Sequence, residues 1–289
     1  MPRPDSFTSE VLTLETEAGV ATLWLDRPEK RNALGPAFWA DLPRAMETIG
    51  ADPDLRVVVV AAKGPHFTVG LDLVAMAGVL AAGGSDSGSA DGSSGRQPSM
   101  AARSRTARTQ ILRMQQSVTS VADCPLPVIA AISGYCIGGG VDLAAACDIR
   151  LASRDAILSV REAKLAIVAD LGSLQRLPSI IGRGHVAELA FTGMDITAER
   201  AAAIGLVNRV SADPEAVLAD ARDLAADIAA NSPLAVQGTK AVLAAGETRS
   251  VSEGLDYVAT WNAGALASDD LREAMVAFAE KRPPVFTGR

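Results

Sequence analysis

Cysteine, histidine and aromatic residues are all scarce in this chain of 289 residues, and each scarcity excludes a class of protein. There are three cysteines and two histidines, with no Cys-X-X-Cys pair and no cluster at the spacing of zinc ligands. A disulfide framework and a structural zinc site are therefore excluded, and a reducing compartment is favoured. Aromatic residues make up only 4% of the chain, so its core has to be built from Ala, Val, Leu and Ile.

Long apolar runs and an excess of positive charge are missing as well. Apolar runs such as Val57–Ala62 are far shorter than the roughly 20 residues that cross a bilayer. Asp and Glu outnumber Lys and Arg by 34 to 27, which argues against a surface for nucleic acid or for an anionic membrane. Met1–Glu10 has no apolar stretch, and Thr287–Arg289 is not a peroxisomal tripeptide. We therefore expect a cytoplasmic protein.

The hydrophobic pattern predicts an α/β protein up to about residue 205 and a helical region from 206 to 289. Strands are expected within 11–26 and at 56–62, 127–132, 148–152 and 156–160. Helices are expected at 36–49, up to about 82, around 111–121, from 141, and at 172–181, 184–192 and 197–204. Ser232 and Pro233 form a typical helix start. Apolar residues of the last region, such as Val217, Leu218, Leu224 and Ile228, have no strands to cover, so we expect them to form an interface between chains.

An insertion at 83–99 separates two of these predicted elements. Its sequence, GGSDSGSADGSSGRQPS, contains nothing that could form a core, so we expect it to be flexible. An inert surface insertion is the simpler interpretation, and a flexible lid beside a ligand site is the alternative.

Two glycine-containing loops, Phe67–Leu73 and Ser133–Gly140, each follow a predicted buried strand and precede a helix. This arrangement leaves free backbone N–H groups at a helix N-terminus, where negative charge is stabilised. Two such groups could bind one developing oxyanion. Taken alone, Gly138–Gly140 fits a tight turn equally well, and it is neither a Walker loop nor a dinucleotide-binding motif.

Three acidic residues follow the second loop: Asp142, Glu162 and Asp170. By its local sequence Asp170 could simply cap a helix, but a carboxylate among aliphatic neighbours is costly unless it has a task. Ser133 and Cys136 have no histidine within reach along the sequence, so nucleophilic catalysis is not supported.

Several motifs, in order along the chain, resemble those of the crotonase (enoyl-CoA hydratase/isomerase) superfamily. The matching segments are Leu25–Leu34, Phe67–Leu73, Pro127–Asp148, Gln175–Leu177 and Phe278–Arg282. Within this superfamily the chain is most similar to the Δ3,5-Δ2,4-dienoyl-CoA isomerases, through Gly138–Arg150, Ala169–Gly172, Leu174–Pro178, Ser232–Lys240 and Leu255–Asn262.

This resemblance implies a crotonase-like spiral of ββα units with a C-terminal helical trimerisation region, assembled as a trimer or a dimer of trimers. It also implies an isomerase of fatty acid β-oxidation that converts 3,5-dienoyl-CoA to 2,4-dienoyl-CoA. The backbone N–H groups of Leu71 and Gly139 would form the oxyanion hole. Glu162 would remove the proton from carbon 2 and Asp170 would deliver one to carbon 6, while Asp142 tunes Glu162.

The resemblance further assigns the contacts to the acyl-CoA thioester. They fall on two loops of one chain and on two residues from a neighbouring subunit: Lys30, Arg31, Ala33, Val69, Gly70, Asp72, Leu73 and Gly138, then Phe278 and Lys281. Lys281 has a simpler interpretation as a cation near a helix C-terminus. No metal or redox cofactor is implied, because CoA is part of the substrate.

Two alternatives to the isomerase remain open. Typical 2-enoyl-CoA hydratases have Glu where this chain has Asp142 and Gly where it has Asp170, but Asp142 and Glu162 could still hold a water. The other alternative is a non-catalytic acyl-CoA-binding protein, because one fold can host several roles.

Overall fold

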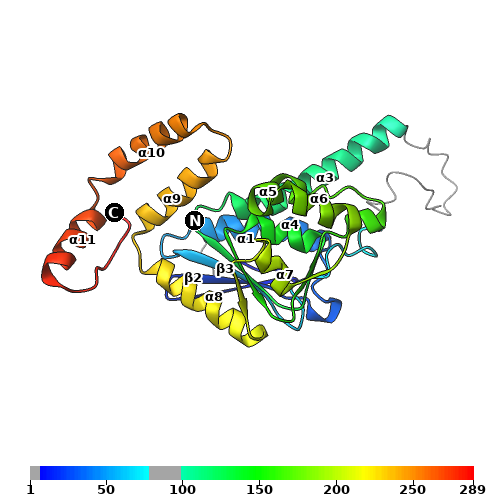
Figure 1. The fold of residues 1–289 in the computed structure, drawn as a ribbon, viewed down its shortest axis with the longest axis horizontal. Coiled ribbons are helices and arrows are strands. Elements are labelled where there is room, and N and C mark those ends of the chain that lie inside the picture. Colours follow the sequence, from blue (N-terminus) through cyan, green and yellow to red (C-terminus); the bar gives the residue numbers. More distant parts are fainter. Residues whose placement is uncertain (1–6, 78–98) are drawn as a thin grey trace.

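The computed structural model describes residues 7–77 and 99–289, which form a sheet-containing core and a helical arm that extends from it (Figure 1). The predicted insertion at 83–99 lies outside the described residues except for Ser99, which caps the next helix through a bond from Ala102 N to its hydroxyl. The predicted helix up to residue 82 is described only at its beginning, where Leu73–Met76 form turns.

The main sheet has six strands in the order β1-β2-β3-β4-β6-β9, and all neighbouring pairs except β1 and β2 are parallel. A second sheet of three strands has the order β5-β7-β8. The strands are β1 Leu12–Glu17, β2 Val20–Leu25, β3 Val57–Ala62, β4 Val128–Ile132, β5 Tyr135–Ile137, β6 Ile149–Ser153, β7 Ile157–Ser159, β8 Ile196–Thr197 and β9 Arg209–Ser211. Helices on both faces bury β3 and β4, which explains their continuous apolar sequences.

The helices lie in three groups. On one face of the main sheet and around the second sheet are α1 Pro36–Ala51, α3 Met100–Ala122, α4 Gly139–Ala146, α5 Ser173–Ile181, α6 Arg183–Thr192 and α7 Ala198–Ala203. The opposite face of the main sheet is covered by α8 Pro214–Ala229. The arm consists of α9 Pro233–Gly246, α10 Val251–Ala265 and α11 Asp269–Glu280. Two 3₁₀ helices, η2 Pro28–Lys30 and η3 Glu162–Leu165, lie in loops.

Helix α8 corrects one prediction. Its apolar residues were expected to form an interface between chains, but Val217 packs against the chain's own sheet, in a cluster with Val57, Val59 and Ile129, and Leu218, Leu224 and Ile228 pack at the edge of that cluster. An amphipathic pattern shows that a face is buried without showing what buries it. The part of the chain that extends from the core therefore begins at α9, and the predicted division at residue 205 stays a prediction.

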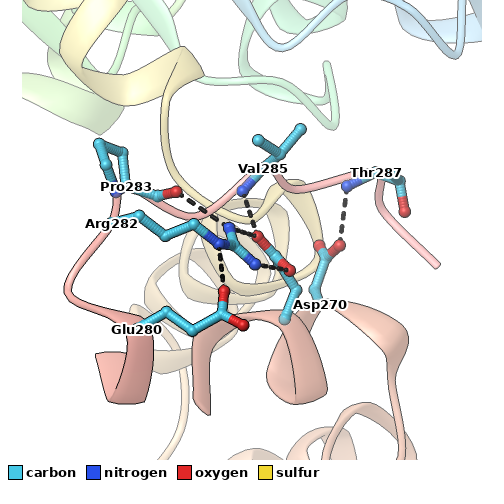
Figure 2. Close-up of polar contacts among 7 residues, drawn as sticks. Asp270, Glu280, Arg282, Pro283, Val285 and Thr287 are labelled. Carbon is cyan, nitrogen blue, oxygen red and sulfur yellow. Dashed lines mark hydrogen bonds and ion pairs between the residues drawn. The ribbon is translucent and has the colours of Figure 1, made fainter. Parts of the chain in front are cut away.

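The segment after α11 folds back along that helix, as Figure 2 shows. The Arg282 guanidinium pairs with both carboxylate oxygens of Glu273, at 2.6 and 3.0 Å, and with Glu280 at 2.7 Å. The backbone N–H of Val285 donates to the same Glu273 carboxylate at 2.8 Å. These bonds lower the pKa of Glu273 to about 2, with Arg282 as the main cause.

Buried Asp270 fixes the end of the same segment. Its carboxylate accepts bonds from the Ser232 hydroxyl at 2.6 Å and from the Thr287 N–H at 2.8 Å. Ser232 precedes α9, but its hydroxyl is used in this contact and does not cap the helix. The arm is tied to the core by Arg56, which donates to the Phe286 carbonyl at 3.2 Å, and by Lys240, which pairs with Asp148 at 2.7 Å.

Candidate active site

Two loops meet where β3 and β4 end. The Phe67 N–H donates to the Ser133 carbonyl at 2.7 Å, the Thr68 N–H to the Tyr135 carbonyl at 2.8 Å, and the Ile137 N–H to the Thr68 carbonyl at 3.1 Å. The second loop, predicted only as glycine-rich, therefore contains the short strand β5. These bonds bring the predicted Phe67–Leu73 and Ser133–Gly140 segments side by side.

Gly70 allows a close approach of the two loops. Its φ is +85°, and a Cβ at this position would lie 2.6 Å from the Ile137 carbonyl oxygen and 3.7 Å from the Gly139 nitrogen. A side chain at residue 70 would push the loops apart. The following residue, Leu71, is thereby held next to the beginning of α4.

Gly139 is the first residue of α4, so its N–H has no partner within the helix. Within residues 7–77 and 99–289, neither this N–H nor that of Leu71 donates to another group of the chain. The two predicted donors thus lie on adjacent loops and are free to bind an external oxygen. The positive end of α4 adds to the stabilisation of a negative charge there.

Asp142 lies in the first turn of α4 and is 1% exposed. Its Oδ1 accepts two bonds from Ser173, from the backbone N–H and from the hydroxyl, both at 2.6 Å. Its Oδ2 is buried without a partner among the described residues. Burial raises the pKa of Asp142 to about 6, although the two Ser173 bonds act to lower it.

Glu162 begins η3, and its Oε1 lies 3.2 Å from the Cβ position of Gly138 at the start of α4. Its Oε2 is buried and likewise has no partner in the described parts of the chain. Burial is the main cause that raises the pKa of Glu162 to about 7, and the charges of Asp142 and Asp170 contribute. A base with a pKa near neutral suits proton transfer at physiological pH.

Asp170 lies in the loop before α5, and burial raises the pKa of its carboxyl group. It does not cap α5, because the N-cap is Gly172 and the first N–H of the helix, that of Ser173, donates to Asp142. The charge of Asp170 raises the pKa of both Asp142 and Glu162, so the three predicted acids lie close enough to act on one another. Carboxyl groups that interact in this way titrate together, over overlapping pH ranges.

The predicted substrate loops also lie together. The Val69 N–H donates to the Arg31 carbonyl at 3.2 Å, and the Leu34 N–H donates to the Gly70 carbonyl at 2.8 Å. Lys30, Ala33 and Leu73 belong to these two loops, and Gly138 directly precedes α4. The Asp72 carboxylate is already engaged, by Arg27 at 2.9 Å and by the Ala75 N–H at 2.9 Å, and these contacts lower its pKa.

Two predicted contacts are not brought to this site within one chain. Phe278, which is 85% exposed, lies near the end of α11, and Lys281 follows that helix. Figure 1 shows α11 at the far end of the arm from α4 and α5. The assignment of both residues to a neighbouring subunit stays a prediction.

The residues that support the acids could not be identified from the sequence. Ser173 holds Asp142, and the Gln115 side chain donates to the Asp170 carbonyl at 2.6 Å. Asn32 joins the substrate loops, donating to the carbonyls of Lys63 and His66 at 3.0 and 2.8 Å. Polar residues of this kind give no signal in a single sequence, because each of these contacts joins residues at least 31 positions apart.

The arrangement combines two free N–H donors with three carboxyl groups of raised pKa. Donors aimed at one point stabilise an oxyanion, and carboxyl groups with pKa values near neutral can both accept and donate protons. The site is therefore equipped to remove a proton next to a carbonyl group and to return one elsewhere on the same molecule.

Comparison with known proteins identifies relatives over most of the chain. The profile of the enoyl-CoA hydratase/isomerase family matches residues 15–91 and 93–289. The chain is 43% identical over 279 residues to the peroxisomal Delta(3,5)-Delta(2,4)-dienoyl-CoA isomerase of Arabidopsis thaliana, covering 96% of both proteins. It is 45% identical over 260 residues to the mitochondrial Delta(3,5)-Delta(2,4)-dienoyl-CoA isomerase of Rattus norvegicus, covering 89% of this chain and 76% of that protein.

A solved structure gives the same result for the fold. The crystal structure of an enoyl-CoA hydratase from Bacillus anthracis superposes with a TM-score of 0.85 at 30% identity, covering 97% of this chain and all of that one. The predicted crotonase-like architecture is confirmed to the level of a parallel main sheet with helices on both faces.

The predicted cytoplasmic location is wrong on this comparison, since both isomerases just described are named for an organelle, the peroxisome or the mitochondrion. Subcellular location depends on short targeting segments rather than on composition or fold. Among the described residues no helix has the length and apolarity needed to cross a membrane. The match of the family profile to nearly all residues, together with relatives at more than 40% identity, shows that this chain belongs to the enoyl-CoA hydratase/isomerase family.

Proposed function

We propose that this protein is an isomerase that converts 3,5-dienoyl-CoA thioesters to 2,4-dienoyl-CoA thioesters. The observation that carries the proposal is the third carboxyl group, Asp170, which lies on the loop directly before Ser173, the residue bonded to the Asp142 carboxylate. The relatives named as dienoyl-CoA isomerases support it independently.

The reaction requires two proton transfers at distant carbons. Glu162 takes a proton from carbon 2, and the electrons move onto the thioester oxygen and along the conjugated chain. The N–H groups of Leu71 and Gly139 stabilise this oxyanion, each contributing about 3–4 kcal/mol to lowering the barrier. Asp170 then delivers a proton to carbon 6, and the double bonds come to rest at positions 2 and 4.

This mechanism needs opposite protonation states in the group that acts at carbon 2 and the group that acts at carbon 6. Glu162 has to be ionised, and a pKa of about 7 allows this near neutral pH. Asp170 has to be protonated, and an acyl chain lying over its half-buried carboxyl group would exclude more water and raise its pKa further. Asp142 stabilises the protonated form of Glu162 through its charge.

The reaction takes one proton from the substrate and returns another, and exchange with solvent then restores the protonation states of Glu162 and Asp170. It involves no net oxidation and requires no redox cofactor. No metal is needed either, because the two N–H donors perform the task that a Lewis acid would otherwise perform. CoA is part of the substrate.

Hydration of 2-enoyl-CoA is the second candidate activity. It is favoured by the buried oxygens of Asp142 and Glu162 that lack partners among the described residues, since two such acceptors could hold a water. Hydration adds water across one double bond and gives no task to Asp170.

The deciding experiment supplies purified protein with paired 3,5-dienoyl-CoA and 2-enoyl-CoA thioesters of equal chain length. We expect the absorbance of the 2,4-dienoyl product to appear, at a rate far above any loss of the 2-enoyl absorbance. Rapid hydration without isomerisation would favour the hydratase, and turnover of neither thioester would favour an acyl-CoA-binding protein.

We also propose that the arm forms the self-association surface of a trimer or a dimer of trimers. Large apolar side chains of the arm are exposed in the single chain, among them Leu243, Leu255, Leu266, Met275 and Phe278. A cavity of about 910 Å³ lies between these helices and the edge of the core. Another copy of the chain would cover this surface and bring Lys281 to a neighbouring site. A monomer mass by light scattering at micromolar concentration would contradict this.

A further inference from the structure

The carboxyl group of Asp170 is fixed by fewer hydrogen bonds than that of Asp142. Two bonds from Ser173 fix Asp142, whereas no other residue within 7–77 and 99–289 donates a hydrogen bond to the Asp170 carboxylate. Asp170 and the two residues after it belong to no helix or strand. The position of this carboxyl group therefore depends on what holds the backbone of the loop.

Gln115, on α3, holds that backbone. Its side-chain Nε2 donates to the carbonyl oxygen of Asp170 at 2.6 Å, a contact between residues 55 positions apart. A planar amide donor at this distance restricts rotation of the peptide group that follows Asp170, and this peptide group sets the direction of the Asp170 side chain.

Arg176, on α5, holds the next carbonyl. Its Nη1 lies 3.5 Å from the Leu171 carbonyl oxygen, and its Nη2 donates to the Thr119 hydroxyl at 3.1 Å, on the same helix as Gln115. The guanidinium fits here only because residue 172 is glycine: φ is +129°, and a Cβ would lie 1.9 Å from Nη1. The loop is thus bonded from two helices at two successive carbonyls.

These contacts are not what keeps α3 in place. The helix is anchored by its buried residues Met114, Ser117, Val118 and Val121. Gln115 lies beside this buried stripe and is partly exposed. A water molecule can replace its bond to a partly exposed carbonyl, so the loss of this side chain should affect the position of the loop more than the folding of the chain.

We propose that Gln115, supported by Arg176 and Thr119, is a positioning residue for Asp170: it aims this carboxyl group at carbon 6 of the bound dienoyl chain. The inference rests on the proposed function. The two halves of the reaction should then be separable, because removal of the carbon-2 proton by Glu162 and the oxyanion hole does not depend on Gln115. Loss of Gln115 should impair the return of the proton and leave its removal intact.

The test uses the full chain with Gln115→Met, which keeps the length of the side chain and removes the donor. The matched control is Gln116→Met, because Gln116 is the exposed neighbour on the same helix. Four quantities are compared with wild type: kcat and KM for a 3,5-dienoyl-CoA, exchange of the carbon-2 hydrogen with deuterated solvent, and the melting temperature.

We expect Gln115→Met to lower kcat about 10- to 100-fold, since small misplacements of a reacting group have effects of this size. Carbon-2 exchange should stay within about twofold of wild type, with KM and melting temperature nearly unchanged. Gln116→Met should behave as wild type. Thr119→Val, which removes the contact of Arg176 with α3, should show the same pattern to a smaller degree.

Other results would overturn the inference. If wild type isomerises the substrate and Gln115→Met loses neither reaction, or loses isomerisation and exchange equally, then Gln115 does not position Asp170. If wild type isomerises no 3,5-dienoyl thioester, the proposed function itself fails, and the inference fails with it.

Discussion

Ser173 donates two hydrogen bonds to a single oxygen of Asp142, and the other oxygen of that carboxylate stays buried without a partner among the described residues. One oxygen is thus fixed to the protein while the other is available to a reacting group. The serine is the first residue of α5, directly after the loop that carries Asp170, so this contact also links two of the three acids.

The variant Ser173→Ala tests this link. It removes the hydroxyl donor and keeps the backbone donor, so the pKa of Asp142 should rise above its value of about 6. A lost bond to a buried charged group should lower the free energy of unfolding by about 1.5–3 kcal/mol. Urea denaturation measures the stability. A less ionised Asp142 raises the pKa of Glu162 less, so the acidic limb of kcat/KM should move to lower pH.

Ser179→Ala is the control for this variant, since Ser179 is an exposed serine on the same helix. It should change neither quantity. An unchanged pH profile in Ser173→Ala would show that Asp142 does not influence the proton transfer.

The raised pKa values predict how stability depends on pH. In the unfolded chain Asp142 and Glu162 titrate near 4, and in the folded protein near 6 and 7. Between these values the folded state binds more protons than the unfolded state, so the free energy of unfolding should fall as pH rises from about 4 to about 7. The contribution of these two carboxyl groups to the free energy of unfolding is fully present only below about pH 4.

The double variant Asp142→Asn/Glu162→Gln should remove this dependence. At pH 8 we expect it to be more stable than wild type by at least about 2 kcal/mol, and near pH 4 the two should be equal. Asp195→Asn is a control whose effect has the opposite pH dependence. Arg161 lowers the pKa of Asp195, so the stabilisation from their contact is lost as pH falls. Equal stabilities of wild type and double variant across the pH range would show that the acids are not desolvated.

Asp270 provides a test of the C-terminal segment. Its replacement by Ala leaves the Ser232 hydroxyl and the N–H groups of Thr287 and Gly288 without their acceptor. We expect a loss of about 1–3 kcal/mol in stability. Release of the segment should also make Val285–Arg289 accessible to carboxypeptidase, and mass spectrometry would follow the digestion.

Asp269→Ala is the control, since Asp269 is the exposed neighbour, paired only with Arg272 one turn along α11. Its stability and its digestion should match those of wild type. Equal resistance of the Asp270→Ala segment would mean that the contacts of Arg282 alone hold it.

The buried strands and the glycine loops could be predicted from the sequence because their signals are local. Five of the six residues of β3 are buried, as its β-branched run predicts. By contrast, β8 and β9 have only two and three residues, too few for any pattern to appear. Such strands exist because longer neighbours pair with them.

Contacts between distant residues could not be predicted for a different reason. The sequence shows that Ser173 and Gln115 are polar but not which atoms they meet, and the face of α8 is visibly apolar although its partner is not. Even the three acids were brought together by resemblance to a family rather than by spacing, since 28 residues separate Asp142 from Asp170.

Asp170→Asn tests the step that distinguishes an isomerase from a hydratase. Asn keeps the size and polarity of the side chain and removes the acidic proton, so isomerisation of a 3,5-dienoyl-CoA should fall by about 10²- to 10⁴-fold. Carbon-2 exchange in deuterated solvent should continue, because it needs only Glu162 and the N–H groups of Leu71 and Gly139. The melting temperature should stay the same or rise, since burial disfavours the ionised form that the variant removes. Asp223→Asn, at an exposed position on α8, makes the same chemical change away from the site and should alter none of the three. Unchanged isomerisation in Asp170→Asn would remove this residue from the mechanism and leave the hydratase as the better supported activity.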